Sequence, residues 1–229
     1  MYRQGAEAEI DVINLMCEEA VRKTRVVKNY RIPQLDDELR KTRTRKEARL
    51  LNAVKELGIL TPFIEYLDLN KGVIVMEYIK GCRLKDFIDG IIPEDGMGQH
   101  KLLGAVMAKI GMDVGKMHAN GITHGDLTTS NMLFYEKDAE ELRRTAGKEE
   151  TVDPADIPVY FIDLSLGERK AILENMGEDL DVFFKAFEST HPALMEYTDN
   201  FWRGYASRNP GVEQVKERLA EIKKRARYR

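Results

Sequence analysis

The pattern of apolar and polar residues predicts strands in the first part of the chain. Residues 63–69 and 73–79 are rich in β-forming side chains and flank Asn70-Lys71-Gly72, a loop whose glycine can take a left-handed conformation. This arrangement predicts a β-hairpin. The beginning of the chain is expected to form a short strand pair with a turn at Gly5. The stretch 36–57 has apolar residues at helical spacing, so a helix is predicted there.

The second part of the chain is mostly helical in pattern. Residues 103–117 carry the clearest helical stripe, with Gly121 placed to end it, and short strands are expected at 132–135 and 159–162. Strands with one helix followed mostly by helices predict an α+β fold with a small sheet-rich lobe and a helical lobe. Further helical patterns occupy 180–186, 193–205 and 213–225. We expect one domain, 1–229, made of an N-lobe at 1–79, a C-lobe at 80–215 and a basic tail at 216–229.

Composition and charge narrow the classes of function. The chain has 229 residues and a formal net charge of -3, so its overall charge gives no reason to bind nucleic acid or membrane. Two cysteines without metal-ligand spacing exclude a zinc module and predict a reducing compartment, the cytoplasm. No apolar stretch approaches the ~20 residues of a membrane-spanning helix. Charge is instead local, because 20–49 and 215–229 are basic whereas 136–156, which has the character of an insertion, is acidic.

The strongest chemical signal lies at residues 124–131, between the long predicted helix and a strand. Asp126 and Asn131 are five residues apart, and Asp163 follows the next apolar strand. Phosphoryl transfer from ATP needs oxygen ligands for Mg²⁺ and a separate acceptor that orients the attacking hydroxyl. We therefore expect Asp126 to orient the nucleophile, with Asn131 and Asp163 as ligands of Mg²⁺.

A cation for the nucleotide phosphates is expected from the first basic segment. Glu47 lies on the apolar stripe of the first predicted helix, and a buried carboxylate needs a partner because an unpaired buried charge costs several kcal/mol. Lys23, in a strand-like segment, would meet this need if it contacted both Glu47 and the phosphates. The alternatives for this role are Lys28, Arg22 and Arg25.

Two weaker signals concern the rest of a nucleotide site. Gly5 and Ala6 would let backbone N–H groups approach phosphate oxygens, although an ordinary tight turn explains them as well. Met76, Glu77 and Ile79 lie where a strand passes into the helical lobe, and backbone groups there would read an adenine edge. A plain strand end explains these residues equally well.

Blocks spread over the whole chain resemble a known family. They are Gly5-Ala6-Glu7-Ala8, Lys28-Asn29-Tyr30-Arg31-x-Pro33, Arg43-Thr44-Arg45-x-Glu47-Ala48-Arg49-Leu50-Leu51, His124-Gly125-Asp126-Leu127-Thr128-Thr129-Ser130-Asn131-Met132 and Ser189-Thr190-His191-Pro192. The family is the small atypical serine/threonine kinases of the PRPK type, the kinase subunit of the KEOPS complex, in its archaeal form. The resemblance implies a two-lobed protein-kinase-like fold that uses ATP and Mg²⁺ beside a metal-dependent subunit making threonylcarbamoyl-adenosine in tRNA. It also places Lys23 and Glu47 at the family's phosphate-lysine and helix-glutamate positions.

The chain departs from ordinary protein kinases around and after these motifs. The usual D-F-G reads Asp163-Leu164-Ser165, no A-P-E follows, and Gly125 replaces the arginine of H-R-D, so control by a phosphorylated activation loop is not expected. We expect an ATP-dependent phosphotransferase or ATPase. The alternatives are a nucleotide-gated scaffold whose basic tail docks on a partner or on tRNA, and a small-molecule kinase.

Overall fold

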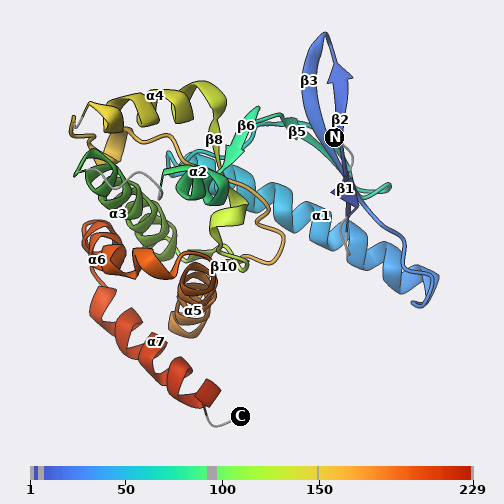
Figure 1. The fold of residues 1–229 in the computed structure, drawn as a ribbon. Helices are drawn as coiled ribbons and strands as arrows, with labels where there is room; N and C mark the ends of the chain where they lie inside the picture. The colour runs from blue at the N-terminus through green and yellow to red at the C-terminus, as the bar shows by residue number, and fades with distance from the viewer. Residues whose placement is uncertain (1–2, 5–7, 92–96, 149, 228–229) are drawn as a thin grey trace.

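The computed structural model describes residues 3–4, 8–91, 97–148 and 150–227. It has a sheet-rich N-terminal lobe and a helical C-terminal lobe (Figure 1), as the sequence pattern predicts. The N-terminal sheet is antiparallel, in the order β1-β2-β3-β5-β4. Its strands are β1 (Arg3–Gln4), β2 (Ala8–Leu15), β3 (Glu18–Arg25), β4 (Ile64–Asp68) and β5 (Val73–Glu77).

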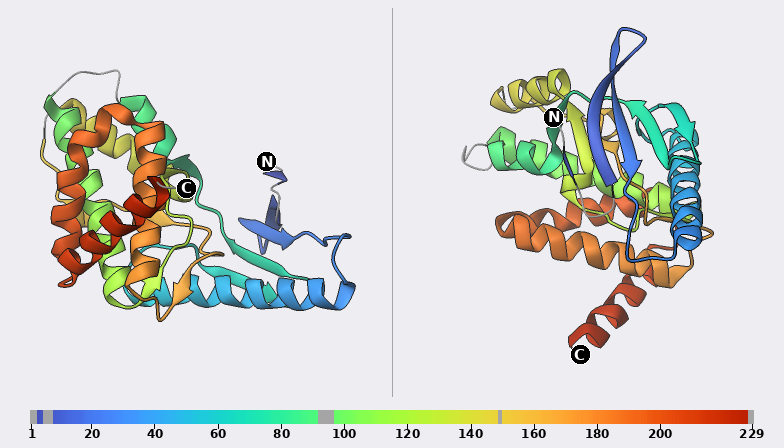
Figure 2. Two further views of the ribbon diagram at one scale, coloured as in Figure 1. Left: turned by 90° about the horizontal axis from the view of Figure 1, so that it is seen from below. Right: turned by 90° about the vertical axis from the view of Figure 1, so that its right-hand side faces the viewer.

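Helix α1 (Pro33–Glu56) runs along the N-terminal sheet (Figure 2). Pro33 begins the helix where a missing N–H costs nothing, and Gly58, with φ of 72°, donates its N–H to the Lys55 carbonyl at the other end. Ala48 on this helix packs against buried side chains of β5. Glu47 faces the sheet beside Ala48, whereas Leu50, Leu51 and Val54 pack into the main hydrophobic core with residues of the C-terminal lobe.

The hairpin between β2 and β3 turns at residues that the sequence pattern did not indicate. The two strands pair from Ala8 with Arg25 to Leu15 with Glu18. Met16 and Cys17 join them with φ values of 48° and 73°. Two left-handed residues are typical of a type I′ turn, which usually contains asparagine or glycine. The expected strand pair of β1 and β2 is present, but the turn expected at Gly5 lies outside the described residues.

The C-terminal lobe is built around the close contact of α3 (Met97–Ala119) with α6 (Thr198–Ala206). A Cβ atom at Gly111 would lie 2.0 Å from the Phe201 carbonyl oxygen, and one at Gly204 would lie 2.0 Å from the Ala108 carbonyl oxygen. Only glycine allows the two backbones to come so near. The other helices are α2 (Leu84–Ile91), α4 (Glu136–Gly147), α5 (Leu173–Thr190) and α7 (Val212–Arg227), with short 3₁₀ turns at Thr129–Asn131, Pro154–Asp156 and Pro192–Tyr197.

Short strands in the C-terminal lobe flank the loops that carry Asp126 and Asp163. The strands β6 (Gly81–Arg83), β8 (Met132–Tyr135) and β9 (Tyr160–Phe161) form one sheet, and β7 (Ile122–Thr123) pairs with β10 (Glu168–Arg169). The acidic insertion begins with α4, and residues 216–227 of the expected basic tail lie within α7, which packs against α5. Within the described ranges, no helix has both the length and the apolar character needed to cross a membrane.

Candidate active site

Asp126 and Asn131 lie in the loop between β7 and β8 and are held together by hydrogen bonds. The Asn131 side-chain nitrogen donates to both the backbone oxygen and Oδ2 of Asp126, each at 2.8 Å. Because the amide nitrogen is used in this way, the amide oxygen of Asn131 is the atom that can face a cation. Asp126 is exposed, so its carboxylate can meet a substrate.

Asp163 lies beside Asn131, just after β9. The Ile162 N–H donates to the Asn131 carbonyl oxygen at 3.0 Å, which places the two predicted metal ligands on adjacent backbone segments. Asp163 has a φ of 58°, a left-handed conformation that residues with a Cβ rarely adopt. Such a conformation costs of order 1–3 kcal/mol and persists only where the surroundings impose it.

Lys23 bridges the two lobes at this point. Its Nζ atom donates to Glu47 Oε1 at 2.6 Å and to Asp163 Oδ1 at 2.7 Å. Burial by itself would lower the pKa of Lys23, but the charges of Glu47 and Asp163 outweigh it and hold that pKa above its usual value. The Lys23 charge in turn overcomes burial and lowers the pKa of Asp163. Lys23 and Asp163 therefore stay ionised at neutral pH.

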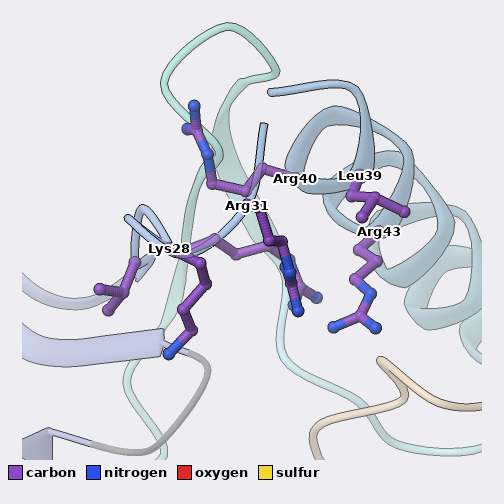
Figure 3. Close-up of a pocket in the computed structure, with 7 residues that line it drawn as sticks. Lys28, Arg31, Leu39, Arg40 and Arg43 are labelled. Atoms are coloured by element: carbon purple, nitrogen blue, oxygen red, sulfur yellow. The ribbon is translucent and has the colours of Figure 1, made fainter. Parts of the chain in front are cut away.

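The other cations considered for contact with the nucleotide phosphates make different contacts in the structure. Arg25 donates to the second oxygen of Glu47, Oε2, at 2.6 Å, so one carboxylate serves two buried cations. Arg22 pairs with Asp11 at the surface. Lys28 lines a separate pocket (Figure 3). Lys23 is thus the candidate that reaches both Glu47 and Asp163.

The loop that carries Asp126 is anchored by Asp179 of α5, a residue that the sequence analysis missed. The Asp179 carboxylate accepts the backbone N–H groups of His124 and Gly125, each at 2.8 Å. It also accepts a hydrogen bond from the ring of His118 at 3.2 Å. Burial would raise the pKa of Asp179, but the hydrogen bond and charge of His118 outweigh it, so that pKa lies below its usual value. Asp179 could have been found by the reasoning used for Glu47, because it lies on the apolar stripe of its helix.

His124 ties the same loop to the segment that carries Asp163. Its Nε2 atom lies 3.0 Å from the Ile162 carbonyl oxygen, and because a carbonyl only accepts, Nε2 carries the proton. The other ring nitrogen then accepts the Asp126 N–H at 3.3 Å. One histidine therefore sets the position of both loops.

The residues expected at the adenine end lie at the junction of the lobes. Met76 and Ile79 are buried. The Glu77 carboxylate accepts the Phe63 N–H at 3.0 Å and the Tyr135 hydroxyl at 2.6 Å, so it connects the residue before β4 to β8 across the junction. The contribution of these three residues to adenine binding stays a prediction. Gly5 and Ala6 lie outside the described residues, and their contribution to phosphate binding also stays a prediction.

The oxygen atoms at this site fit Mg²⁺ only if a nucleotide supplies more of them. Asp163 and Asn131 provide the hard oxygen donors that Mg²⁺ prefers. Over the described ranges, no group of three or more His, Cys, Asp and Glu residues could hold a metal ion alone. This agrees with the usual magnesium site of a phosphotransferase, in which one or two protein ligands are completed by phosphates and water.

The fold has two lobes, and Lys23 joins a glutamate on a helix, Glu47, to an aspartate at a strand end, Asp163. These features define a protein of the kinase-like class. Residues 16–140 match the model of the RIO domain. The chain belongs to the RIO-domain family.

Curated relatives in archaea cover the chain from end to end. It is 36% identical to the "KEOPS complex subunit Bud32" of Pyrococcus abyssi, over 100% of this chain and 96% of that protein. It is 32% identical to a "Probable serine/threonine-protein kinase BUD32 homolog" of Archaeoglobus fulgidus, over 98% of this chain and 94% of that protein. A "Probable bifunctional tRNA threonylcarbamoyladenosine biosynthesis protein" of Methanocaldococcus jannaschii is 37% identical over 98% of this chain, which spans only 36% of that longer protein. The resemblance to the KEOPS kinase subunit is thereby confirmed.

Solved structures show the same fold at low sequence identity. The chain matches "WaaP in complex with acyl carrier protein" with a TM-score of 0.61 at 17% identity, covering 99% of this chain and 87% of that one. It matches the Rio2 kinase of Chaetomium thermophilum, in complex with ADP/Mg²⁺ and phosphoaspartate, with a TM-score of 0.53 at 16% identity, covering 100% and 71%. The predicted protein-kinase-like fold is confirmed.

Proposed function

We propose that this chain is an ATP- and Mg²⁺-dependent phosphotransferase or ATPase that acts as the kinase subunit of a KEOPS-type complex and supports threonylcarbamoyl-adenosine modification of tRNA. One observation carries the catalytic part of the proposal. The Nζ atom of Lys23 lies between Glu47 and Asp163, at 2.6 and 2.7 Å, and Asp163 adjoins Asn131. The names of the archaeal relatives support the part that concerns the complex and tRNA.

The proposed roles follow from the positions of the side chains. Lys23, held by Glu47, contacts the nucleotide phosphates, and Asp126 orients the hydroxyl or water that attacks them. Asp163 and Asn131 hold Mg²⁺, which when bound neutralises charge on the phosphate oxygens. Met76, Glu77 and Ile79 border the adenine.

The catalytic proposal is tested by removing single carboxylates from the purified full chain. Asp126→Asn is expected to lower ATP turnover about 10²–10⁴-fold, because an oriented acid–base group contributes that much. Asp163→Ala is expected to abolish turnover. Glu140→Gln, which changes an exposed carboxylate on α4, is the matched control and should turn over normally. Undiminished turnover in a folded Asp126→Asn or Asp163→Ala variant would contradict the proposal.

The same preparation separates the two reactions that the site supports. Free phosphate and labelled protein are measured together from one sample of γ-labelled ATP. Because the helical lobe is short and has no A-P-E segment, we expect phosphate release to exceed transfer to protein. Addition of the metal-dependent tRNA-modifying subunit, the proposed partner, should increase release. If the partner changes neither product, the proposal for the complex is wrong while that for ATP chemistry stands.

Two further parts of the proposal rest on smaller observations. The basic end of α7 has exposed residues Lys223, Lys224 and Arg225, which supports contact with tRNA. Deletion of 223–229 should then weaken tRNA binding.

A cytoplasmic location is supported by Cys17 and Cys82, which are both free thiols.

A further inference from the structure

A series of buried hydrogen bonds joins the loop between β7 and β8 to α6. It begins at Asp179, which accepts the N–H groups of His124 and Gly125. It continues through the ring of His118 on α3, whose Nε2 atom donates to Asp179 at 3.2 Å. Nδ1 of the same ring lies 2.8 Å from the hydroxyl oxygen of Tyr205 on α6. Because both ring nitrogens are hydrogen-bonded, the ring is held in one orientation.

The series ends at Asn209, in the turn between α6 and α7. Nδ2 of Asn209 donates to the Tyr205 hydroxyl at 2.9 Å, and Oδ1 of the same amide accepts the Gly211 N–H at 2.8 Å. Because a backbone N–H only donates, the contact with Gly211 fixes which atom of the amide faces Tyr205. Burial raises the pKa of Tyr205 above its usual value, so its hydroxyl keeps its proton.

The side chains of this series are withdrawn from water and closely packed. Each is at most 5% exposed: Asp179, His118, Tyr205 and Asn209. The backbone of Tyr205 is also fixed, because a Cβ atom at Gly115 would lie 2.6 Å from its carbonyl oxygen and only glycine lets α6 come so near to α3 (Figure 1). A buried polar group that loses its partner is destabilised, so the loss of one link disturbs the next. The four side chains therefore form one rigid unit.

The position of the proposed acid–base residue depends most directly on this series. Its last contacts are the backbone N–H groups of His124 and Gly125, and the next residue along the chain is Asp126. The segment of Asp163 is one contact further, because the ring of His124 lies 3.0 Å from the Ile162 carbonyl oxygen. A change at the far end of the series therefore acts mainly on the position of Asp126.

We propose that Tyr205 and Asn209 are positioning residues for ATP turnover, which act through His118 and Asp179 to hold Asp126 where it orients the attacking group. This inference rests on the proposed function, in which Asp126 has that role. It assigns to the end of α6 and the turn after it a part in the reaction, although both lie far along the chain from the loop that they hold.

The proposal is tested with Tyr205→Phe in the full chain. The variant loses the hydroxyl but keeps the ring, which meets the His118 ring edge to face with 5.6 Å between the centroids. The kcat for ATP turnover should fall about 5–50-fold, because a misplacement of about 1 Å can cost about 10²-fold. The KM for ATP should change less than about threefold, since Lys23 keeps its contact with Glu47.

The matched control is Tyr197→Phe. It removes another buried tyrosine hydroxyl that is hydrogen-bonded to Nδ1 of a histidine on α3, in this case His100 near the beginning of the helix. Its kcat should stay within about twofold of the wild type. In a His118→Leu background, Tyr205→Phe should lower kcat by less than about twofold further, because a residue that acts through His118 has no separate effect once that ring is gone.

Hydrogen exchange of the backbone amides at 124–126, measured without ATP, reports on the loop directly. Exchange there should be at least about threefold faster in Tyr205→Phe than in the wild type or in Tyr197→Phe, because the acceptor of two of these N–H groups is less firmly held. This measurement needs no turnover. If the wild type did not turn over ATP, the proposed function would be wrong, and exchange would still decide whether the series holds the loop.

Thermal unfolding first establishes that each variant is folded. If Tyr205→Phe is not, Asn209→Ala, which removes the donor to the same hydroxyl, replaces it and should lower kcat about two- to fivefold. In the folded variant, an unchanged kcat or unchanged exchange at 124–126 would overturn the proposal. So would equal losses of kcat in Tyr205→Phe and Tyr197→Phe, or additive losses with His118→Leu, because they would indicate a general loss of stability.

Discussion

Replacing Glu47 by glutamine removes a buried negative charge while keeping the shape of the side chain. Glu47 is 1% exposed and accepts hydrogen bonds from Lys23 and Arg25, each at 2.6 Å. In the variant Lys23 and Arg25, which are 7% and 5% exposed, both lose the charge of Glu47. Removing one member of a buried ion pair costs about 3–5 kcal/mol.

That cost is large enough to measure as a change in Tm. In a protein of this length about 1 kcal/mol shifts Tm by roughly 2–4 °C, so Glu47→Gln should unfold about 6–20 °C below the wild type. The matched control is Glu168→Gln. Glu168 pairs with Lys46, the neighbour of Glu47, at 2.6 Å, but their side chains are 52% and 33% exposed. Exposed pairs contribute about 0–1 kcal/mol, so Tm should fall by no more than about 4 °C.

The measurement is thermal unfolding followed by circular dichroism at neutral pH and low salt. If the Tm of Glu47→Gln lies within about 2 °C of the wild type, or the two variants unfold together, the ion pairs of Glu47 with Lys23 and Arg25 do not stabilise the fold. Turnover of ATP by the folded variant, measured well below its Tm, then reports separately on the position of Lys23.

Three other outcomes are expected. Asp179→Asn should lower the unfolding free energy by at least about 1–3 kcal/mol and also lower ATP turnover, because an amide leaves the backbone N–H of His124 or Gly125 unpaired. A variant as stable as the wild type in urea would contradict this. Asp163 and Asp179 have pKa values below the ordinary 3.8, so the stability they provide should be complete above about pH 5. It should be lost as the pH falls below 3.8 towards their folded-state pKa values. A constant unfolding free energy between about pH 3 and 6 would exclude this contribution. Cys17→Gly should raise the unfolding free energy by about 0.5–1 kcal/mol, because φ of 73° suits glycine, and a decrease in denaturant midpoint would show that the turn is not strained.

The elements that sequence predicted correctly are those specified by short-range patterns. The helix expected at 36–57 is α1, Pro33–Glu56, and the hairpin around 70–72 is β4 and β5. In both, apolar periodicity and a well-placed glycine act within a few residues, so neighbours along the chain determine the structure. The turn at Met16 and Cys17 had no such signal, because the pairing of β2 with β3 along their whole length imposes it.

For the site, the sequence by itself determined the types and order of groups: Asp126, then Asn131 five residues later, then Asp163 after an apolar strand. It also indicated that Glu47 must have a cationic partner, since a carboxylate on an apolar stripe cannot be left unpaired. Only the tertiary structure decided that Lys23 and Arg25 share Glu47, and that Asp179 holds the loop before Asp126. These contacts join residues far apart in the chain, and their partners are selected by which side chains the packed lobes bring within hydrogen-bond distance.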